Sequence, residues 1–315
     1  MKKEQLALKK ISLEDERFRT SYSFSLKKLK LSLKEIGLLH PPLVTRRDKR
    51  FILVSGWKRV LACRELSFST VPVYVIEEKD ELQTFLIAFY ENLAAREFGL
   101  LEKAEVLSRL RKFGEDEVKI IRHYLPLLDI PQTLSHLDSY LAFSGFEPEV
   151  KRAAHEKNMT FPALKLLTEF EVEEQRILLP FLLPLGQNKR KEILEDLIEI
   201  SRRNDISVKN LILSEEIQAI QGNDALTPLQ KADKIRLLLR KQRYPAFSSW
   251  KDSFDSLLKR MRWPEEVSVD PSPFFEDENF TVTFTFEDQE QFKSNLDKLE
   301  ELSSKDEFVQ IFKLR

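Results

Sequence analysis

The sequence predicts a helix-rich α+β fold, and three observations support this prediction. Glycine is rare, with 7 among 315 residues, while leucine, lysine and glutamate are abundant, as in helical proteins. Apolar runs with strand character lie near the two ends of the chain, and the stretch between them has helical periodicity. The length suits two or three domains. We therefore expect a small α/β domain over 1–113, an all-helical domain over 114–244 with a helix-turn-helix-like segment, and a small α/β domain over 245–315.

The first domain is expected to be built around a strand, a helix and a second strand, which together make a small α/β unit. A helix before it ends at Gly37, a residue that commonly stops helices. In chain order, the expected elements are a helix over 29–37, a strand within 38–47 after an extended Pro-Pro segment, its partner over 51–55, a helix starting near Arg59, a strand over 71–76, and helices over 81–93 and 100–113.

The middle of the chain, from Glu115 to about Leu213, has helical spacing throughout. Residues 118–143 fit a helix-turn-helix, although the turn lacks the glycine often found there; a plain helical bundle is the alternative. Thr227, Pro228 and Gln230 then form a capping signature for a helix that extends through Arg243. We expect Leu229, Ile235, Leu238 and Leu239 of this helix to face a core. Its basic face is either solvated or a contact for a polyphosphate.

The last domain combines an alternating strand with an amphipathic helix. Alternation over 280–286 places its apolar residues on one face, and the helix that follows has one apolar stripe. These residues are Phe280, Val282, Phe284 and Phe286 in the strand, and Phe292, Leu296, Leu299 and Leu302 in the helix. So small a domain has little core of its own. We therefore expect it to mediate homodimerisation through the strand or the helix.

Composition excludes several classes of protein. A net charge of −1 gives no global attraction to nucleic acid, so a polyanion site must be a local patch. The single cysteine, Cys63, excludes an internal disulfide and a cysteine-rich zinc site. No segment has the apolar length of a signal peptide or a membrane span. We expect a cytoplasmic protein without a membrane partner.

The stretch 55-SGWKR-59 places a glycine and two cations where a strand gives way to a helix. One explanation is a simple turn, since glycine adopts positive φ and the cations are solvated. The other is an anion site, because the amides at a helix N-terminus, together with lysine and arginine, suit a phosphate group. These residues alone leave both explanations open.

Three segments in order resemble the N-terminal domain of ParB-type partition proteins: 37-GLLHPPLV-44, 53-LVSGWKRVLA-62 and 90-YENLAARE-97. That family has segments of the type G-x-x-x-P-x-x-V, G-E-R-R-x-x-A and E-N-x-x-R in the same order. The helical region, including 147-EPEV-150, also resembles the family's central helix-turn-helix domain. The resemblance covers about the first two thirds of the chain.

The resemblance implies a DNA-binding protein of chromosome or plasmid partition, regulated by CTP with Mg²⁺ and associated with the bacterial nucleoid. Its implied partners are DNA, a second copy of itself and a ParA-type ATPase. Carried over by position, the phosphate contacts are Gly56, Lys58, Arg59 and Asn92, the metal residue is Glu91, and the pocket wall is Gly37, His40, Pro41 and Trp57. The expected DNA contacts are Gln132, Thr133 and His136 in the helix-turn-helix, with Arg236, Arg240 and Arg243 in the basic helix.

The chain also departs from the family pattern. Trp57 stands where the family has glutamate, and Lys58 replaces an arginine, which keeps the charge but loses the forked donor geometry. Ala95 occupies the arginine position of the third motif. Arg96 is displaced by one residue, or about 100° on a helix, so it is expected to point elsewhere.

Two other functions stay open from the sequence. One is an interaction scaffold derived from ParB that no longer binds nucleotide. The other is a phosphate-transferring enzyme, because sulfiredoxin and a few kinases share the N-terminal fold; here Cys63 is expected to be a buried apolar cysteine. CTP hydrolysis, if present, is expected to be weak.

Overall fold

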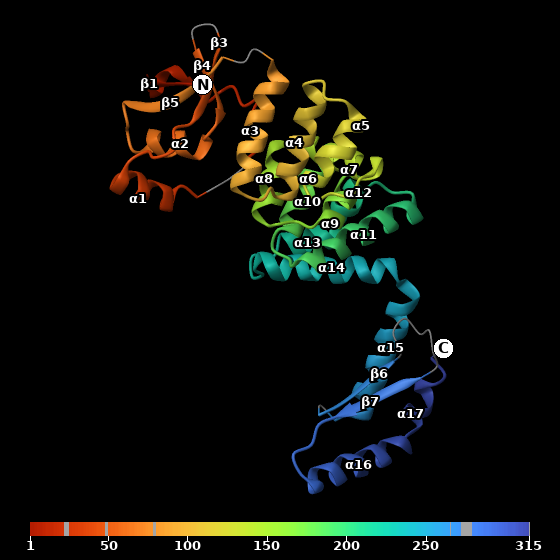
Figure 1. Cartoon of the computed structure of the whole chain (residues 1–315). Coiled ribbons are helices and arrows are strands. Elements are labelled where there is room, and N and C mark those ends of the chain that lie inside the picture. The colour runs from red at the N-terminus through yellow and green to blue at the C-terminus, as the bar shows by residue number, and fades with distance from the viewer. Residues whose placement is uncertain (22–24, 48–49, 78–79, 265, 272–278, 315) are drawn as a thin grey trace. The chain divides into compact units, whose positions relative to one another are not determined.

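The computed structural model describes residues 1–21, 25–47, 50–77, 80–264, 266–271 and 279–314. It divides into two compact units, the first made of Met1–Glu195 with Val208–Ala232 and the second of Asp196–Ser207 with Asp233–Arg315. The predicted helix-rich α+β fold is confirmed, with a strand-containing region near each end of the chain (Figure 1). The finer division into three domains stays a prediction. No helix in the described part of the chain has the length and apolar character needed to cross a membrane.

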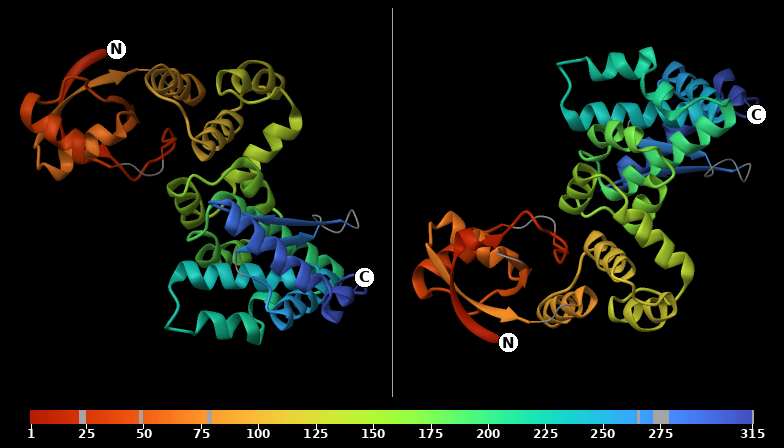
Figure 2. Two further views of the ribbon diagram at one scale, coloured as in Figure 1. Left: turned by 90° about the horizontal axis from the view of Figure 1, so that it is seen from below. Right: turned by 90° about the horizontal axis from the view of Figure 1, so that it is seen from above.

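One five-stranded sheet organises the N-terminal part of the first unit. Its strands are β1 (Lys2–Ala7), β2 (Ile11–Ser12), β3 (Leu43–Arg47), β4 (Arg50–Ser55) and β5 (Thr70–Ile76), in the order β1-β5-β3-β4-β2. In both views of Figure 2 these strands lie together at one end of their unit. As predicted, β3 pairs antiparallel with β4. The charged turn between them includes residues 48–49, which lie outside the described residues.

Strand β1 was not predicted from the sequence. It pairs antiparallel with β5, with Lys2 opposite Val75 and Ala7 opposite Thr70. Its sequence shows no alternation of apolar and polar residues, because Leu6 is the one residue of this strand that is buried. The strand owes its position to pairing with β5 rather than to its own apolar pattern.

The core beneath the sheet fixes the position of the β4–α2 turn. Val44, Leu53 and Val71 from three neighbouring strands are 0% exposed. Helices α1 (Lys27–Ile36) and α2 (Trp57–Glu65) pack against each other and add Leu33 and Val60 to the same core. With both β4 and α2 anchored, the turn that joins them is held at both ends.

Helices α3 (Glu81–Ala95) and α4 (Leu100–Lys112) follow the predicted segments closely, and the rest of the first unit after its sheet is helical, as expected. The helices that follow α4 are α5 (Glu117–Lys119), a π-helical turn (Ile120–Tyr124), α6 (Leu125–Leu127), α7 (Leu134–Ser144), α8 (Pro148–Glu156), α9 (Phe161–Leu167), α10 (Val172–Leu182), the start of α11 (Gln187–Asn204), α12 (Val208–Ile212) and α13 (Glu215–Gln221). A short 3₁₀ helix covers Leu8–Lys10.

The predicted helix-turn-helix is present as a helical stretch over 117–127, a turn, and α7, which packs against α4. The missing glycine is replaced by Asp129, whose φ is 53°. Aspartate tolerates this left-handed conformation better than most residues do, because its short side chain can hydrogen-bond locally. The turn therefore forms without a glycine.

Helix α14 (Pro228–Arg243) begins as predicted, because Thr227 and Gln230 form reciprocal hydrogen bonds at its N-terminus. The predicted core face is partly wrong. Leu229 is 50% exposed, whereas Ala232, Ile235 and Leu239 are buried. The buried face thus starts one turn later than expected.

The second unit ends in α15 (Pro245–Met261), β6 (Val267–Pro271), β7 (Phe280–Phe284), α16 (Gln289–Ser303) and α17 (Asp306–Ile311). Strands β6 and β7 pair antiparallel. The core of this part contains Phe254, Leu257, Met261, Leu302 and Ile311. Of the predicted apolar strand face, Phe280 packs against this core, whereas Val282 and Phe286 are 44% and 54% exposed. In α16, Leu296 is also 44% exposed.

Candidate functional site

The turn between β4 and α2 requires glycine for two reasons. Gly56 is the N-cap of α2 with φ of 97°, a left-handed conformation that strains other residues. A Cβ atom at this position would lie 2.7 Å from the Cβ of Pro42. No side chain caps the helix. The first amides of α2 therefore point out of the helix toward whatever occupies the turn.

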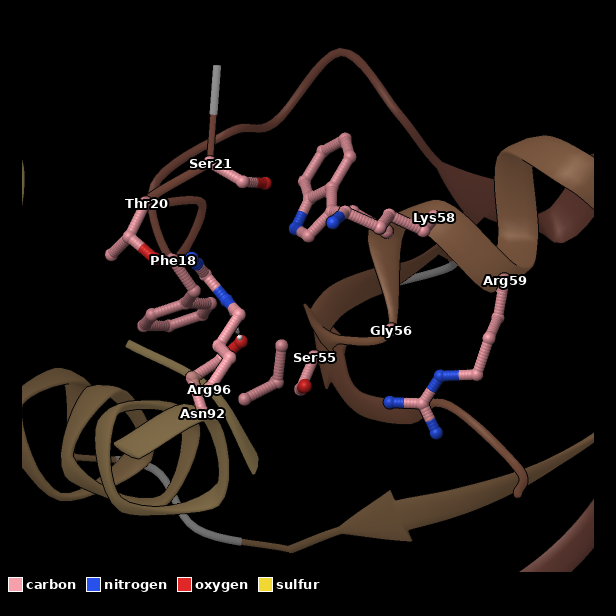
Figure 3. A pocket seen from close by; sticks show the side chains of 11 residues that line it. Phe18, Thr20, Ser21, Ser55, Gly56, Lys58, Arg59, Asn92 and Arg96 are labelled. Atoms are coloured by element: carbon pink, nitrogen blue, oxygen red, sulfur yellow. Dashed lines mark hydrogen bonds between the residues drawn. The ribbon is translucent and has the colours of Figure 1, made fainter. Parts of the chain in front are cut away.

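A pocket of about 130 Å³ opens beside this turn (Figure 3). Its volume is well below the roughly 300 Å³ at which sites for drug-sized ligands begin. It corresponds to roughly four water molecules, which is room for a phosphate-sized group rather than a whole nucleotide. The pocket is lined by Phe18, Thr20, Ser21, Val54, Ser55, Gly56, Trp57, Lys58, Arg59, Asn92 and Arg96.

All four residues predicted to contact phosphate line this one pocket. Gly56, Lys58 and Arg59 come from the β4–α2 turn, and Asn92 comes from α3 on another side of the pocket, as the labelled side chains in Figure 3 show. Residues 36 positions apart in sequence, Gly56 and Asn92, are thus brought together. Helix α3 packs against β4, which brings Asn92 to the side of the turn.

Arg59 is held in place by a pair of acceptors. One guanidinium nitrogen donates to the carbonyl oxygen of His40 at 2.9 Å, and another donates to a carboxylate oxygen of Glu91 at 3.0 Å. A weaker contact reaches the carbonyl of Pro41 at 3.4 Å. The second oxygen of Glu91 accepts a hydrogen bond from the hydroxyl of Ser55. Glu91 therefore lies behind the lining, where it orients Arg59.

The predicted pocket wall is divided. Trp57 lines the pocket, whereas His40 and Pro41 contact Arg59 through their backbone carbonyls. Gly37 ends α1 with φ of 71°, and its amide donates to the carbonyl of Leu33. Gly37 thus shapes the chain before the Pro-Pro segment and is not among the described residues that line the pocket.

The expectation that Arg96 points elsewhere is wrong. It assumed that α3 continues through this residue, but α3 ends at Ala95, and Arg96 has an extended backbone with φ of −165°. The side chain consequently returns to the pocket, where it lies with Asn92 in Figure 3. Its Nη1 donates to Glu102 at 2.6 Å, and Glu102 is almost fully buried. Only knowledge of where the helix ends could have revealed this.

Trp57 has a buried ring with an unsatisfied polar atom. The residue is 6% exposed and belongs to the core under the sheet. The guanidinium of Arg19 lies 5.1 Å from the ring centroid, a cation–π distance. Its indole Nε1 has no hydrogen-bond partner among the described residues. A buried N–H without an acceptor is costly.

The donor set of the pocket does not fit magnesium. Mg²⁺ is bound by carboxylates, waters and phosphate oxygens in near-octahedral geometry. No carboxylate is among the described residues that line the pocket. Among all the described residues, no group of three or more acidic, histidine or cysteine side chains could hold a metal ion. Glu91, the predicted metal residue, is engaged with Arg59 and Ser55.

The thiol of Cys63 is 0% exposed within α2. Burial raises the pKa of this thiol, because the thiolate loses the solvation that stabilises it. The predicted structural role of the cysteine agrees with these observations, and a sulfiredoxin-like reaction lacks an accessible nucleophile here.

The predicted DNA-reading residues of α7 lie at its exposed N-terminus. Gln132 and Thr133 are exposed. The hydroxyl of Thr133 caps the helix by accepting from the amide of His136, and it also contacts His136 Nδ1 at 2.7 Å. The opposite face of α7 buries Leu137 and Tyr140. The helix therefore presents a short polar end, of which Thr133 is partly committed to capping.

The three arginines of the basic helix belong to the second unit. Arg236 contacts Asp233 at 3.2 Å, and Arg240 lies 5.8 Å from the ring of Tyr244. Arg243 donates to the carboxylate of Asp196 at 2.7 Å, and that carboxylate is 1% exposed. Burial opposes the charge of Arg243, but the bond to Asp196 and neighbouring charges raise its pKa overall. Arg243 thus has a structural partner inside its own unit.

Comparison with known proteins finds similarity to one family in the N-terminal part of the chain. Residues 2–93 match the family described as the ParB N-terminal domain. A protein of Helicobacter pylori, named as a probable chromosome-partitioning protein ParB, is 26% identical over 178 residues, which is 55% of this chain and 57% of that protein. Residues 2–93 are thus similar to the ParB N-terminal domain, and the chain resembles ParB partition proteins at low identity. The match spans little more than half the length of this ParB relative.

Two solved ParB structures from Caulobacter crescentus are also similar. Both are C-terminally truncated chromosome-partitioning proteins. The first is complexed with CTP-γ-S; it is 20% identical, with a TM-score of 0.27, over 56% of this chain and 98% of that chain. The second is complexed with the centromeric parS site; it is 17% identical, with a TM-score of 0.33, over 61% of this chain and 98% of that chain.

Proposed function

We propose that this ParB-type protein binds DNA in chromosome or plasmid partition and that a nucleotide, CTP in the first place, regulates it. The observation that supports the nucleotide is the convergence of Gly56, Lys58, Arg59 and Asn92 on one phosphate-sized pocket. The open amides at the start of α2 add a favourable dipole for an anion. The sequence segments shared with ParB proteins favour CTP over other nucleotides.

The pocket supports binding more strongly than catalysis. Arginine and the helix amides can hold phosphate oxygens, but no described lining residue is a general base. Because Trp57 stands where the family has a carboxylate, we expect an affinity no better than tens of micromolar, about −6 kcal/mol. We expect CTP hydrolysis to be weak.

Calorimetry with CTP, ATP and GTP tests this function on the full chain. CTP binding that is lost in Arg59→Ala supports the pocket, and Arg64→Ala on the exposed side of the same helix is the matched control. Heat from CTP that survives Arg59→Ala would place nucleotide elsewhere. An absence of heat with every nucleotide would favour the other candidate described below.

For DNA, we propose contacts from the polar end of α7, chiefly Gln132 and His136, and from the half-buried arginines of α14, Arg236, Arg240 and Arg243. Base-reading helices commonly present their N-terminal residues to the major groove, while cations hold the phosphates. A parS-like site is the first DNA to test, by fluorescence anisotropy at several salt concentrations. Binding that does not depend on sequence would contradict the role of α7.

We also propose that the protein acts as a homodimer and works with a ParA-type ATPase. The dimer is supported by the exposed apolar side chains Val282, Phe286 and Leu296 in the C-terminal part. The ATPase partner rests on the family alone. A pull-down with the product of a neighbouring Walker-type ATPase gene, where one exists, tests it.

A second candidate is a scaffold that dimerises but no longer binds nucleotide. The specific observation in its favour is Trp57, whose buried ring occupies a motif position that carries a carboxylate in the family. The two candidates differ in one measurement, the heat of CTP binding.

A further inference from the structure

Strand β1 forms an open edge of the five-stranded sheet. It is the first strand in the order β1-β5-β3-β4-β2, so β5 covers one of its sides and no described strand covers the other. The strand at the opposite edge, β2, has only two residues, whereas β1 has six. An open edge presents backbone N–H and C=O groups with which another extended chain can pair. The side of β1 that faces away from β5 is therefore the place where this sheet can be extended.

One hydrogen bond shows which backbone groups of β1 point outward. The amide of Leu8 donates to the carbonyl oxygen of Ser69 at 3.1 Å, directly beyond the last pair of the β1–β5 ladder. Opposite residues of an antiparallel ladder alternate between pairs that exchange hydrogen bonds and pairs that point away from each other. The even-numbered residues of β1 therefore bond to β5. The odd-numbered residues Lys3, Gln5 and Ala7 direct their N–H groups away from the sheet.

The far side of β5 gives the same alternation independently. Tyr74 lies opposite Lys3, and its amide donates to the carbonyl oxygen of Pro42 at 2.9 Å, on the side away from β1. A cross-strand hydrogen bond between side chains, from Gln5 Nε2 to Thr70 Oγ1 at 3.0 Å, holds β1 on β5 without using the outward backbone groups. Among the described residues, the odd-numbered amides of β1 make no backbone hydrogen bond outside the ladder.

Charge decides which kind of chain suits this edge. Residues 1–76, which include all five strands, contain 17 lysines and arginines but 7 aspartates and glutamates, although the whole chain has a net charge of −1. Lys2 and Lys3 are exposed at one end of β1, and Lys9 and Lys10 are exposed just beyond the other. A second copy paired about a two-fold axis would bring these lysines beside their equivalents, and like charges disfavour such pairing. An acidic segment would meet opposite charge at both ends of the edge.

We propose that β1 binds an extended, acidic peptide segment of another protein by adding it to the sheet as a further strand. The outward groups of the odd-numbered residues supply backbone hydrogen bonds, and the flanking lysines select acidic side chains. Glu4 does not oppose this selection, because its side chain lies on the same face as the buried Leu6 and contacts Lys2 at 3.7 Å. No described lining residue of the pocket beside Gly56 belongs to β1, so the inference goes beyond the nucleotide function and does not depend on it.

Fluorescence anisotropy of the full chain with labelled peptides tests this surface. The probe is a short peptide of alternating glutamate and valine with both ends blocked, and we expect saturable binding that weakens as salt rises. The same peptide methylated on every backbone nitrogen keeps its charge but cannot donate hydrogen bonds. It should bind at least about tenfold more weakly. A peptide of alternating lysine and valine should not bind.

Ala7→Pro is the matched change in the protein. The backbone of Ala7 has φ of −64°, the value that proline itself imposes, and its N–H points away from β5. Proline therefore removes an outward donor without removing a bond of the ladder. We expect the affinity for the acidic peptide to fall at least about tenfold. Ala7→Ser keeps the N–H and should leave the affinity unchanged, and circular dichroism checks that both variants are folded.

Hydrogen exchange in the wild-type chain does not depend on any variant. Without peptide, the amides of Lys3, Gln5 and Ala7 should exchange faster than those of Glu4 and Leu6, which bond to β5. The acidic peptide should slow the three odd-numbered amides selectively.

The outcomes decide between this inference and its alternatives. Equal binding of the methylated peptide, or unchanged binding by Ala7→Pro, would reduce the interaction to general charge attraction and overturn the added strand. Odd-numbered amides that are slowed by duplex DNA and not by the peptide would assign the edge to nucleic acid and overturn it as well. Odd-numbered amides that become slow when the chain concentration alone is raised would assign the edge to a second copy. Each of these results leaves the nucleotide function standing.

Discussion

The two sheets of the molecule differ in how completely their apolar side chains are buried. In the first unit, Val44, Leu53 and Val71 are 0% exposed beneath a five-stranded sheet. In the second, the two-stranded sheet β6–β7 leaves Val282 44% exposed, and Phe286 beyond β7 is 54% exposed. A two-stranded sheet is marginal alone. The first sheet buries its apolar side chains within one chain, whereas the second leaves part of its apolar surface exposed.

The largest expected effect separates these two cores directly. Leu53→Ala removes a side chain that is 0% exposed, and we expect it to lower the free energy of unfolding by about 3 kcal/mol. Val282→Ala removes a side chain that is 44% exposed and should cost less than about 0.5 kcal/mol in a dilute monomer. Urea unfolding followed by circular dichroism measures both. Equal losses would contradict the difference between the sheets.

A second prediction concerns the buried charge of the second unit. Arg243→Ala removes the guanidinium that donates to the carboxylate of Asp196, which is 1% exposed, and we expect a loss on the order of 3 kcal/mol. Arg240→Ala removes a contact with Tyr244 and should cost at most about 1 kcal/mol. Thermal unfolding compares the two variants. If Arg243→Ala is harmless, the pair does not hold this unit together.

The third prediction tests the incomplete core as a dimer surface. Replacing Phe286 and Leu296 together by serine removes exposed apolar area, so the dimer dissociation constant should rise at least about tenfold, or 1.4 kcal/mol. Leu229→Ser, at a leucine that is 50% exposed in the first unit, is the control. Analytical ultracentrifugation at several concentrations measures the constant. A wild-type chain that is monomeric at micromolar concentration would end this proposal.

The smallest expected effect is on DNA binding. Because few cations are available, the slope of log affinity against log salt should be shallow, about −2 to −4. Arg240→Ala should reduce its magnitude by about 0.9, the value for one phosphate contact. Arg64→Ala, at an exposed residue of α2, should leave the slope unchanged. A slope that Arg240→Ala does not alter would remove α14 from the DNA surface.

Much of the fold could be predicted because its signals are local. The strands β4 and β5 contain apolar runs, and the Thr227–Gln230 cap is a short-range motif. Strand β1 could not be predicted, because its place depends on pairing with β5, far along the chain. The exposure of Leu229 could not be predicted either, because it also depends on tertiary contacts.

The candidate site was predictable in composition but not in geometry. The motif segments indicated Gly56, Arg59 and Asn92, and these residues do line one pocket. The role of Arg96 required the end of α3 to be known to the residue. The partnering of Glu91 with Arg59 and Ser55 required side-chain positions, which spacing along a sequence cannot supply.

The pairing of β1 with β5 also has a consequence for the order in which the protein folds during synthesis. Lys2 lies opposite Val75, so the first strand made has no partner until the last strand of the sheet has left the ribosome. Contacts of such long sequence separation form slowly, because the entropy of closing a long loop is lost before the contacts contribute any stabilising free energy. We infer that β1 completes its pairing late, after β5 has formed.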